Sequence, residues 1–155
     1  MEITQKKGLI IMKNAICIAI GIVGSFIAYL FGGWSASLTT LLIFIGIDYV
    51  SGLIVAGVFH KSPKTETGTL ESRAGFKGLI RKFMVLVFVL ISYRLDVAVG
   101  TTYIKDAVCI AFITNELISI VENAGLMGIP APAVITNAID ILKKKGEKTD
   151  DKADN

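Results

Sequence analysis

The sequence predicts an all-α integral membrane protein with four transmembrane helices and with both ends in the cytoplasm. Two observations support this prediction: the high apolar content and the grouping of the basic residues. Of the 155 residues, 53% are hydrophobic and only 19% are charged, and the mean hydropathy is +0.66. A soluble domain of this length cannot bury so much apolar surface. The net charge of +3 is small and gives no reason to expect a nucleic-acid partner.

Four apolar stretches each approach the roughly 20 residues that a helix needs to cross a hydrocarbon core about 30 Å thick. Lipid cannot satisfy exposed backbone groups, and no stretch alternates as barrel strands do, so each stretch is expected to be a helix. Polar and charged residues interrupt the third and fourth stretches. The predicted spans are residues 15–31, 38–59, 83–99 and 107–121.

Basic residues decide the predicted orientation. Fourteen of the 16 lysines and arginines lie in three segments: before the first span, between the second and third, and after the fourth. The positive-inside rule places all three segments in the cytoplasm, which requires an even number of crossings. The middle segment forms a basic cytoplasmic loop whose second half is expected to begin an interfacial helix beside anionic lipid. Its candidate functional residues are Arg73, Lys77, Arg81 and Lys82.

The two ends of the chain allow alternatives. The N-terminus could be a cleaved signal peptide, but its apolar run exceeds the usual length of about 7 to 15 residues and another span follows almost at once. Beyond the fourth span, residues 132–145 predict an amphipathic helix for the membrane surface, for a partner, or for packing against the protein's own cytoplasmic loop. Residues 1–145 would then form the membrane domain, and residues 146–155 a charged, disordered tail.

Three ionisable residues fall well inside the predicted spans, Asp48, Arg94 and Glu116, and two more, Asp96 and Glu122, lie nearer the edges. Each costs roughly 2.5 to 3.5 kcal/mol at the middle of a membrane helix unless it is paired or hydrated. With a rise of about 1.5 Å per residue, the first three lie near the midplane. Arg94 could therefore pair with Asp48 or Glu116, within one chain or between chains. The alternative to a functional role is a pair that only fixes helix register.

Two helix faces are predicted to pack against other helices. Asp48 aligns with Gly52 and Ala56 at a spacing of four, and small residues at this spacing are typical of helix contacts in membranes. In the fourth span, five polar residues fall within about 120° of one another. Such a stripe needs another polar surface or water, so it predicts an oligomer interface or a pore lining. Its members are Asn115, Glu116, Ser119, Glu122 and Asn123.

The sequence contains no recognisable catalytic machinery. It has no nucleophile with a histidine partner, no glycine-rich phosphate loop and no metal-ligand spacing. We therefore expect neither an enzyme nor a bound cofactor or metal. Cys17 and Cys109 lie in apolar runs and are expected to pack as small hydrophobic residues.

Three segments resemble those of the phage lysis and toxin-secretion holins of Gram-positive bacteria and their phages. The resemblance implies a protein that accumulates in the bacterial cytoplasmic membrane, self-associates and opens lesions that release a cell-wall hydrolase (endolysin) or a toxin. The implied partners are other copies of the chain, the lipid bilayer and, indirectly, the endolysin or toxin. Arg94 lies outside these segments, so its role depends only on the depth argument. The segments are residues 48–56, which begin Asp48-Tyr49-Val50-Ser51-Gly52, residues 72–82 and residues 115–132.

Two other classes fit parts of the pattern. Small proton-coupled transporters also have four short helices and a membrane carboxylate, but they carry their key glutamate in the first span, and residues 15–31 contain no charge. A membrane scaffold would instead use the basic loop and the amphipathic C-terminal segment to recruit partners. For a scaffold, Lys77 and Arg81 would matter and Asp48 and Glu116 would not.

Overall fold

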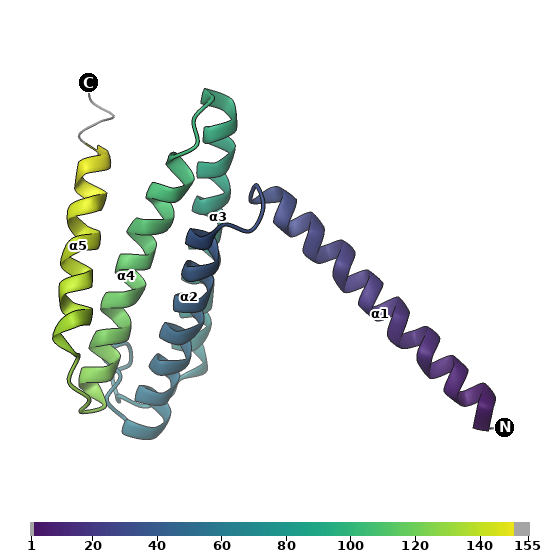
Figure 1. The fold of residues 1–155 in the computed structure, drawn as a ribbon. Coiled ribbons are helices and arrows are strands. Elements are labelled where there is room, and N and C mark those ends of the chain that lie inside the picture. Colours follow the sequence, from purple (N-terminus) through teal and green to yellow (C-terminus); the bar gives the residue numbers. More distant parts are fainter. Residues whose placement is uncertain (1, 151–155) are drawn as a thin grey trace. The chain divides into compact units, whose positions relative to one another are not determined.

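The computed structural model describes residues 2–150, with side chains for residues 11–144. Within residues 2–150 the chain forms helices and no strand, so the all-helical prediction is confirmed (Figure 1). The helices divide into two units at Trp34–Ser35, with α1 in the first unit and the other helices in the second. The helices are α1 (Glu2–Leu30), α2 (Ala36–Ile54), the π-helix η1 (Val55–Phe59), α3 (Ser72–Val99), α4 (Ile104–Leu126) and α5 (Ala133–Asp150).

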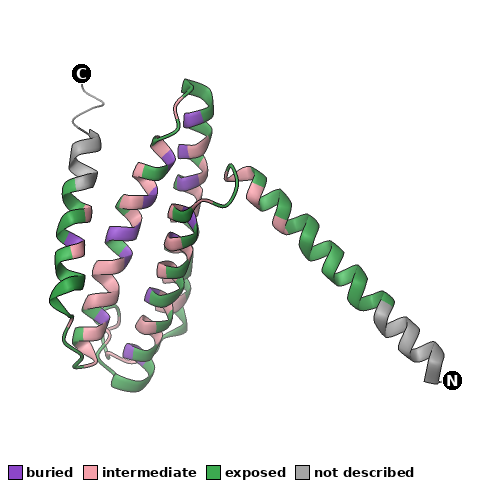
Figure 2. Cartoon of the chain, in the orientation of Figure 1, coloured by how far each residue is buried: buried purple, intermediate pink, exposed green. Residues whose placement is uncertain are grey.

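Helix α1 presents apolar side chains in every direction. From Ile11 onward most of its residues are exposed (Figure 2), and they include large apolar residues such as Ile18 and Phe26. Residues 11–30 are long and apolar enough to cross a membrane, and so is Ala36–Phe59; these two segments alone meet both conditions among the described residues. The helix ends at Gly32 and Gly33, which both have positive φ and carry the chain into a tight turn.

The second unit is built around α4, which contacts α2, α3 and α5. Helices α2 and α4 run in the same direction. Helix α3 runs in the opposite direction and leads from the end of η1 back to the start of α4 (Figure 1). The side chains of Leu41, Val89 and Cys109 are fully buried among these three helices. At the start of the parallel pair, the Ser37 hydroxyl donates to Asp106 Oδ1 over 2.6 Å, which joins the first turns of α2 and α4.

Asp96 forms the corner between α3 and α4. Its carboxylate accepts hydrogen bonds from the backbone N–H of Ile104 (3.0 Å) and of Lys105 (2.8 Å), and from the Thr101 hydroxyl (2.7 Å). These are the unpaired N–H groups that open α4, and an acceptor with negative charge stabilises a helix start. The corner thereby fixes where α4 begins relative to the end of α3.

Helices α3 and α5 differ in extent from the sequence prediction. Residues 72–82, predicted as loop and interfacial helix, are continuous with the predicted third span, so Arg73, Lys77, Arg81 and Lys82 lie on α3 rather than in a loop. Helix α5 continues to Asp150, where a disordered tail was predicted from residue 146; residues 151–155 of that tail lie outside the described residues. It packs against α4, with Ile139 buried.

The loop from η1 to α3 closes on Gly68. The Ser62 N–H donates to the Gly68 carbonyl over 3.0 Å, while Gly68 itself has φ +72°. A Cβ atom on this residue would lie 2.4 Å from the His60 carbonyl oxygen. Gly68 is therefore required both by its backbone conformation and by the space around it.

We expect Gly68→Ala to destabilise the protein by about 1–3 kcal/mol, because alanine would bring both an unfavourable φ and a clash with backbone. The measurement is the unfolding midpoint of the detergent-solubilised full-length chain. The matched control is Gly46→Ala: Gly46 lies within α2 with no atom within 4 Å of its added Cβ. Equal midpoints for the two variants would contradict the role given to Gly68.

A buried charge cluster as the candidate functional site

One lysine and two carboxylates, each from a different helix, meet inside the second unit. Lys82 Nζ of α3 lies 2.6 Å from Asp48 Oδ2 of α2 and also donates to Glu116 Oε2 of α4. The Lys82 side chain is 13% exposed, and both carboxylate side chains are 4% exposed. Burial removes the water that would otherwise solvate these charges, so each group depends on its partners for stabilisation.

Asn123 extends the cluster along α4. Its amide Nδ2 donates to Asp48 Oδ1 over 3.1 Å and to the Ser51 hydroxyl over 2.9 Å. Directly opposite lies Gly52, where an added Cβ would be 3.8 Å from the same amide nitrogen. Among the described residues, no buried side-chain nitrogen or oxygen lacks a hydrogen-bond partner. Each buried polar atom of the cluster thus has at least one hydrogen-bond partner.

Helix direction explains why these residues share a level. Asp48 is as far along α2 from its first residue, Ala36, as Glu116 is along α4 from its first residue, Ile104. Because the two helices are parallel and begin at the same end, both carboxylates lie about 18 Å along the bundle. Helix α3 begins at Ser72 and runs in the opposite direction. Because it begins before the predicted third span, Lys82 lies within the bundle at the level of both carboxylates.

Two glycines let α3 approach α2 beside the cluster. Added Cβ atoms on Gly75 and Gly78 would lie 3.9 and 4.0 Å from the Tyr49 hydroxyl and ring. The Tyr49 side chain therefore lies against a face of α3 that has no side chains at these two positions. Lys82 follows one turn after Gly78 on the same face, directly next to Asp48.

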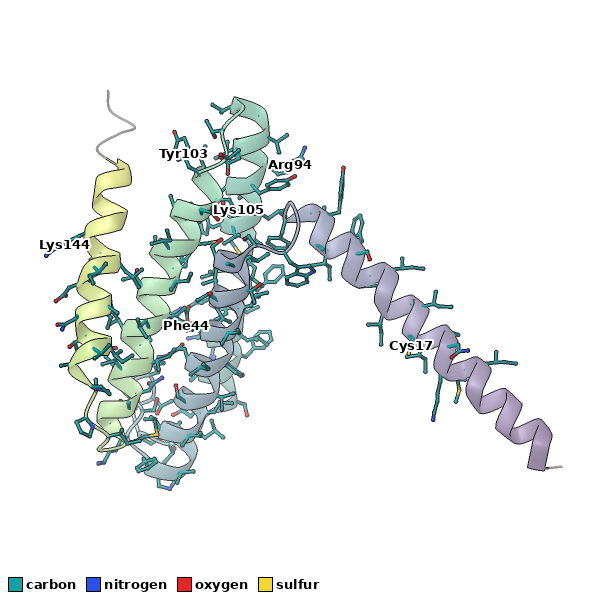
Figure 3. The ribbon with its side chains drawn as sticks, viewed as in Figure 1. Cys17, Phe44, Arg94, Tyr103, Lys105 and Lys144 are labelled. Atoms are coloured by element: carbon teal, nitrogen blue, oxygen red, sulfur yellow. The ribbon has the colours of Figure 1, made fainter. Side chains whose placement is uncertain are left out.

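Within the chain both carboxylates contact Lys82 and not Arg94, for which pairing within or between chains had been considered; pairing of Arg94 between copies stays a prediction. Arg94 is exposed and lies near the α3–α4 corner, at the same end of the bundle as Tyr103 and Lys105 (Figure 3). The depth estimate put Arg94 at the level of these carboxylates, whereas Lys82, about three turns earlier on α3, is the residue that reaches them. The spacing of Gly78, Lys82 and Val89 on one face of α3 was the signal that could have identified Lys82.

The polar stripe of α4 divides into a buried and an exposed part. Glu116 and Asn123 are buried in the cluster, and Ser119 is half-buried beside it. Asn115 and Glu122 are exposed. One edge of the stripe therefore packs inside the bundle. The other edge is exposed and available for further contacts.

Comparison with known proteins identifies the family. Residues 25–144 match the sequence pattern of the bacteriophage holin family. The chain belongs to this family. The matched range contains α2, α3 and α4 in full, and so the whole of the charge cluster. The holin family is not a family of enzymes, and the family together with the two long apolar helices indicates a membrane protein.

Relatives of this holin-family chain occur in bacteria and in a phage. It is 37% identical over 132 residues to an uncharacterized protein of Listeria monocytogenes, covering 84% of this chain and 89% of that protein. It is 39% identical over 123 residues to an uncharacterized protein of Halalkalibacterium halodurans, covering 76% and 85%. The "Probable holin" of Bacillus phage phi105 is 29% identical over 128 residues, covering 82% and 88%. No solved structure matches the chain significantly.

We expect Lys82→Met to destabilise the bundle by about 3–5 kcal/mol, because it leaves two buried carboxylates next to each other without a cation. The matched control is Arg94→Met, which removes an exposed cation from the same helix. Unfolding midpoints of the detergent-solubilised proteins distinguish the two variants. A second comparison adds Asp48→Asn and Glu116→Gln to Lys82→Met and is expected to recover most of the loss. A Lys82→Met protein as stable as the Arg94→Met protein would contradict the cluster.

Proposed function

We propose that this chain is a holin that self-assembles in the bacterial cytoplasmic membrane and opens lesions through which a cell-wall hydrolase, or a toxin, leaves the cell. Family membership gives the class of protein. The observation that carries the mechanism is the buried cluster of Lys82, Asp48 and Glu116 inside an otherwise apolar bundle. Ionisable groups within a membrane protein are costly to bury and typically mark function.

The proposed arrangement has four crossings, α1 to α4, with both ends in the cytoplasm. The exposed apolar face of α3 supports the third crossing: it continues from Phe76 through Phe83 and Phe88 to Leu95. At a rise of about 1.5 Å per residue this face spans roughly 28 Å, close to the thickness of a hydrocarbon core. In this arrangement the cluster, Lys82 included, lies within the membrane, and the first and last basic segments and the loop lysines Lys61 and Lys64 lie on the cytoplasmic side.

Helix α5 has to be treated separately in this arrangement. It runs back along α4, so Lys143, about 15 Å from the start of α5, lies midway along α4. Lysine and aspartate side chains at that depth in lipid would be unfavourable. We therefore assign α5 to the cytoplasmic membrane surface, apolar face inward, once α4 has inserted.

The charge cluster suggests how a closed form converts into an open one. With all three groups ionised, one lysine balances only one of the two carboxylates, so these three side chains together carry one uncompensated negative charge. Separation of the helices would let water or neighbouring copies solvate that charge. Exposed Asn115 and Glu122 on α4, with Ala111 and Gly125 on the same face, offer the first contact between copies.

The decisive experiment is inducible expression in a bacterium together with a cytoplasmic cell-wall hydrolase. We expect abrupt lysis that requires the hydrolase. Lysis without the hydrolase, or drug resistance without lysis, would contradict the proposal, and the latter outcome would favour a transporter.

In the same assay we expect Asp48→Asn and Glu116→Gln each to delay the onset of lysis. Either change leaves a balanced pair with Lys82, which lowers the cost of keeping the bundle closed. Glu66→Gln, an exposed carboxylate of the loop, is the control and should keep the original timing. Unchanged timing in both cluster variants, at equal amounts of protein in the membrane, would remove the cluster from the mechanism.

A further inference from the structure

Next to the charge cluster, a pocket of about 480 Å³ opens between α3, α4 and the loop that precedes α3. Arg73, Lys77 and Arg81 form one row of its lining, because residues spaced by four lie above one another on a helix. Lys64 of the loop and Lys82 of the cluster add two further cations. The volume is within the range of pockets that hold small molecules.

The pocket has an excess of positive charge. Its lining contains five basic residues and three acidic ones, which gives a net charge of +2. Two of the acids, Asp48 and Glu116, already bind Lys82. Among the side chains of residues 11–144, no carboxylate lies within 4.0 Å of the charged nitrogens of Arg73, Lys77 or Arg81. Their donors are thus available to an anion.

An apolar surface adjoins the basic row on the same helix. Phe76, Leu79, Ile80 and Phe83 are between 48% and 63% exposed. At about 100° per residue, they lie immediately beside Arg73, Lys77 and Arg81 around α3. These four residues do not line the pocket. A ligand bound to the cations reaches the apolar face only if it extends out of the pocket, past the basic row, along α3. A free phosphate ion would contact only the cations.

We propose that this pocket binds the phosphate of an anionic phospholipid, whose acyl chains lie along the apolar face of α3. Arginine side chains donate two parallel hydrogen bonds to phosphate oxygens, and lysines add charge. Basic pockets between membrane helices on the cytoplasmic side favour anionic headgroups. A zwitterionic headgroup brings its own cation toward five basic residues and is disfavoured.

The test is native mass spectrometry of the full-length protein, released from detergent after incubation with phosphatidylglycerol and phosphatidylcholine in equal amounts. We expect retained phosphatidylglycerol in excess over phosphatidylcholine. Arg73→Gln, Lys77→Gln and Arg81→Gln together should reduce that preference about tenfold or more, since each basic residue contributes to attraction of anionic lipid. The matched control replaces Lys61, Lys143 and Lys144, three exposed lysines outside the pocket, by Gln.

Three results would overturn the proposal. The first is the same preference in the triple pocket variant as in the original protein, or an equal loss in the control variant. The second is complete displacement of the lipid by millimolar inorganic phosphate, which would make the pocket a phosphate site without lipid. The third is a triple variant that keeps its lipid but loses bound copies of the chain, which would assign the cations to a neighbouring protomer. None of these measurements depends on lysis, so their outcome does not decide the holin proposal, which the lysis assay tests separately.

Discussion

The Lys82 ammonium group is the one point at which side chains of α2, α3 and α4 meet in a single charged contact among the described residues. It binds a carboxylate of α2 on one side and a carboxylate of α4 on the other. In a medium of low dielectric constant, neither carboxylate can lose this cation without a large cost. The positions of α2, α3 and α4 along one another are therefore restricted to those that keep Lys82 between Asp48 and Glu116. The glycines facing Tyr49 and Asn123 are the packing counterpart of this restriction.

The composition and basic segments were enough to predict helices and a membrane protein, and charges within the apolar stretches were enough to select Asp48 and Glu116 as candidates. They were not enough to identify the cation that joins them. Mean hydropathy is averaged over a window of sequence, and so over all faces of a helix. It therefore does not separate Lys82 from its basic neighbours Arg81 and Lys77. The distinction between Lys82, which faces the bundle, and Arg81, which is exposed, depends on tertiary packing. Helix periodicity can suggest such a distinction, but only once the start of α3 is known.

The same packing gives Asp96 a clear explanation that does not require catalysis or transport. As an isolated carboxylate near the end of an apolar stretch, it could have been another member of a functional set. In the structure its oxygens receive the first N–H groups of α4 and the Thr101 hydroxyl. The polar residues of this membrane protein thus fall into two groups. One closes helix ends, and the other lies within the bundle or on the open edge of α4.

The order of the cluster residues along the chain has a consequence for biogenesis. Of the three helices that share the cluster, α2 with Asp48 leaves the ribosome first, α3 brings its cation Lys82, and Glu116 follows on α4 after an equal length of chain. A translocation channel that released each helix separately into lipid would release a lone carboxylate, then a lone ammonium group. When α2 stays beside the channel until α3 arrives, neither the carboxylate nor the ammonium group enters lipid without its partner. The membrane insertion of this protein is thereby expected to proceed in groups of helices, and its rate to depend on how quickly α3 follows α2.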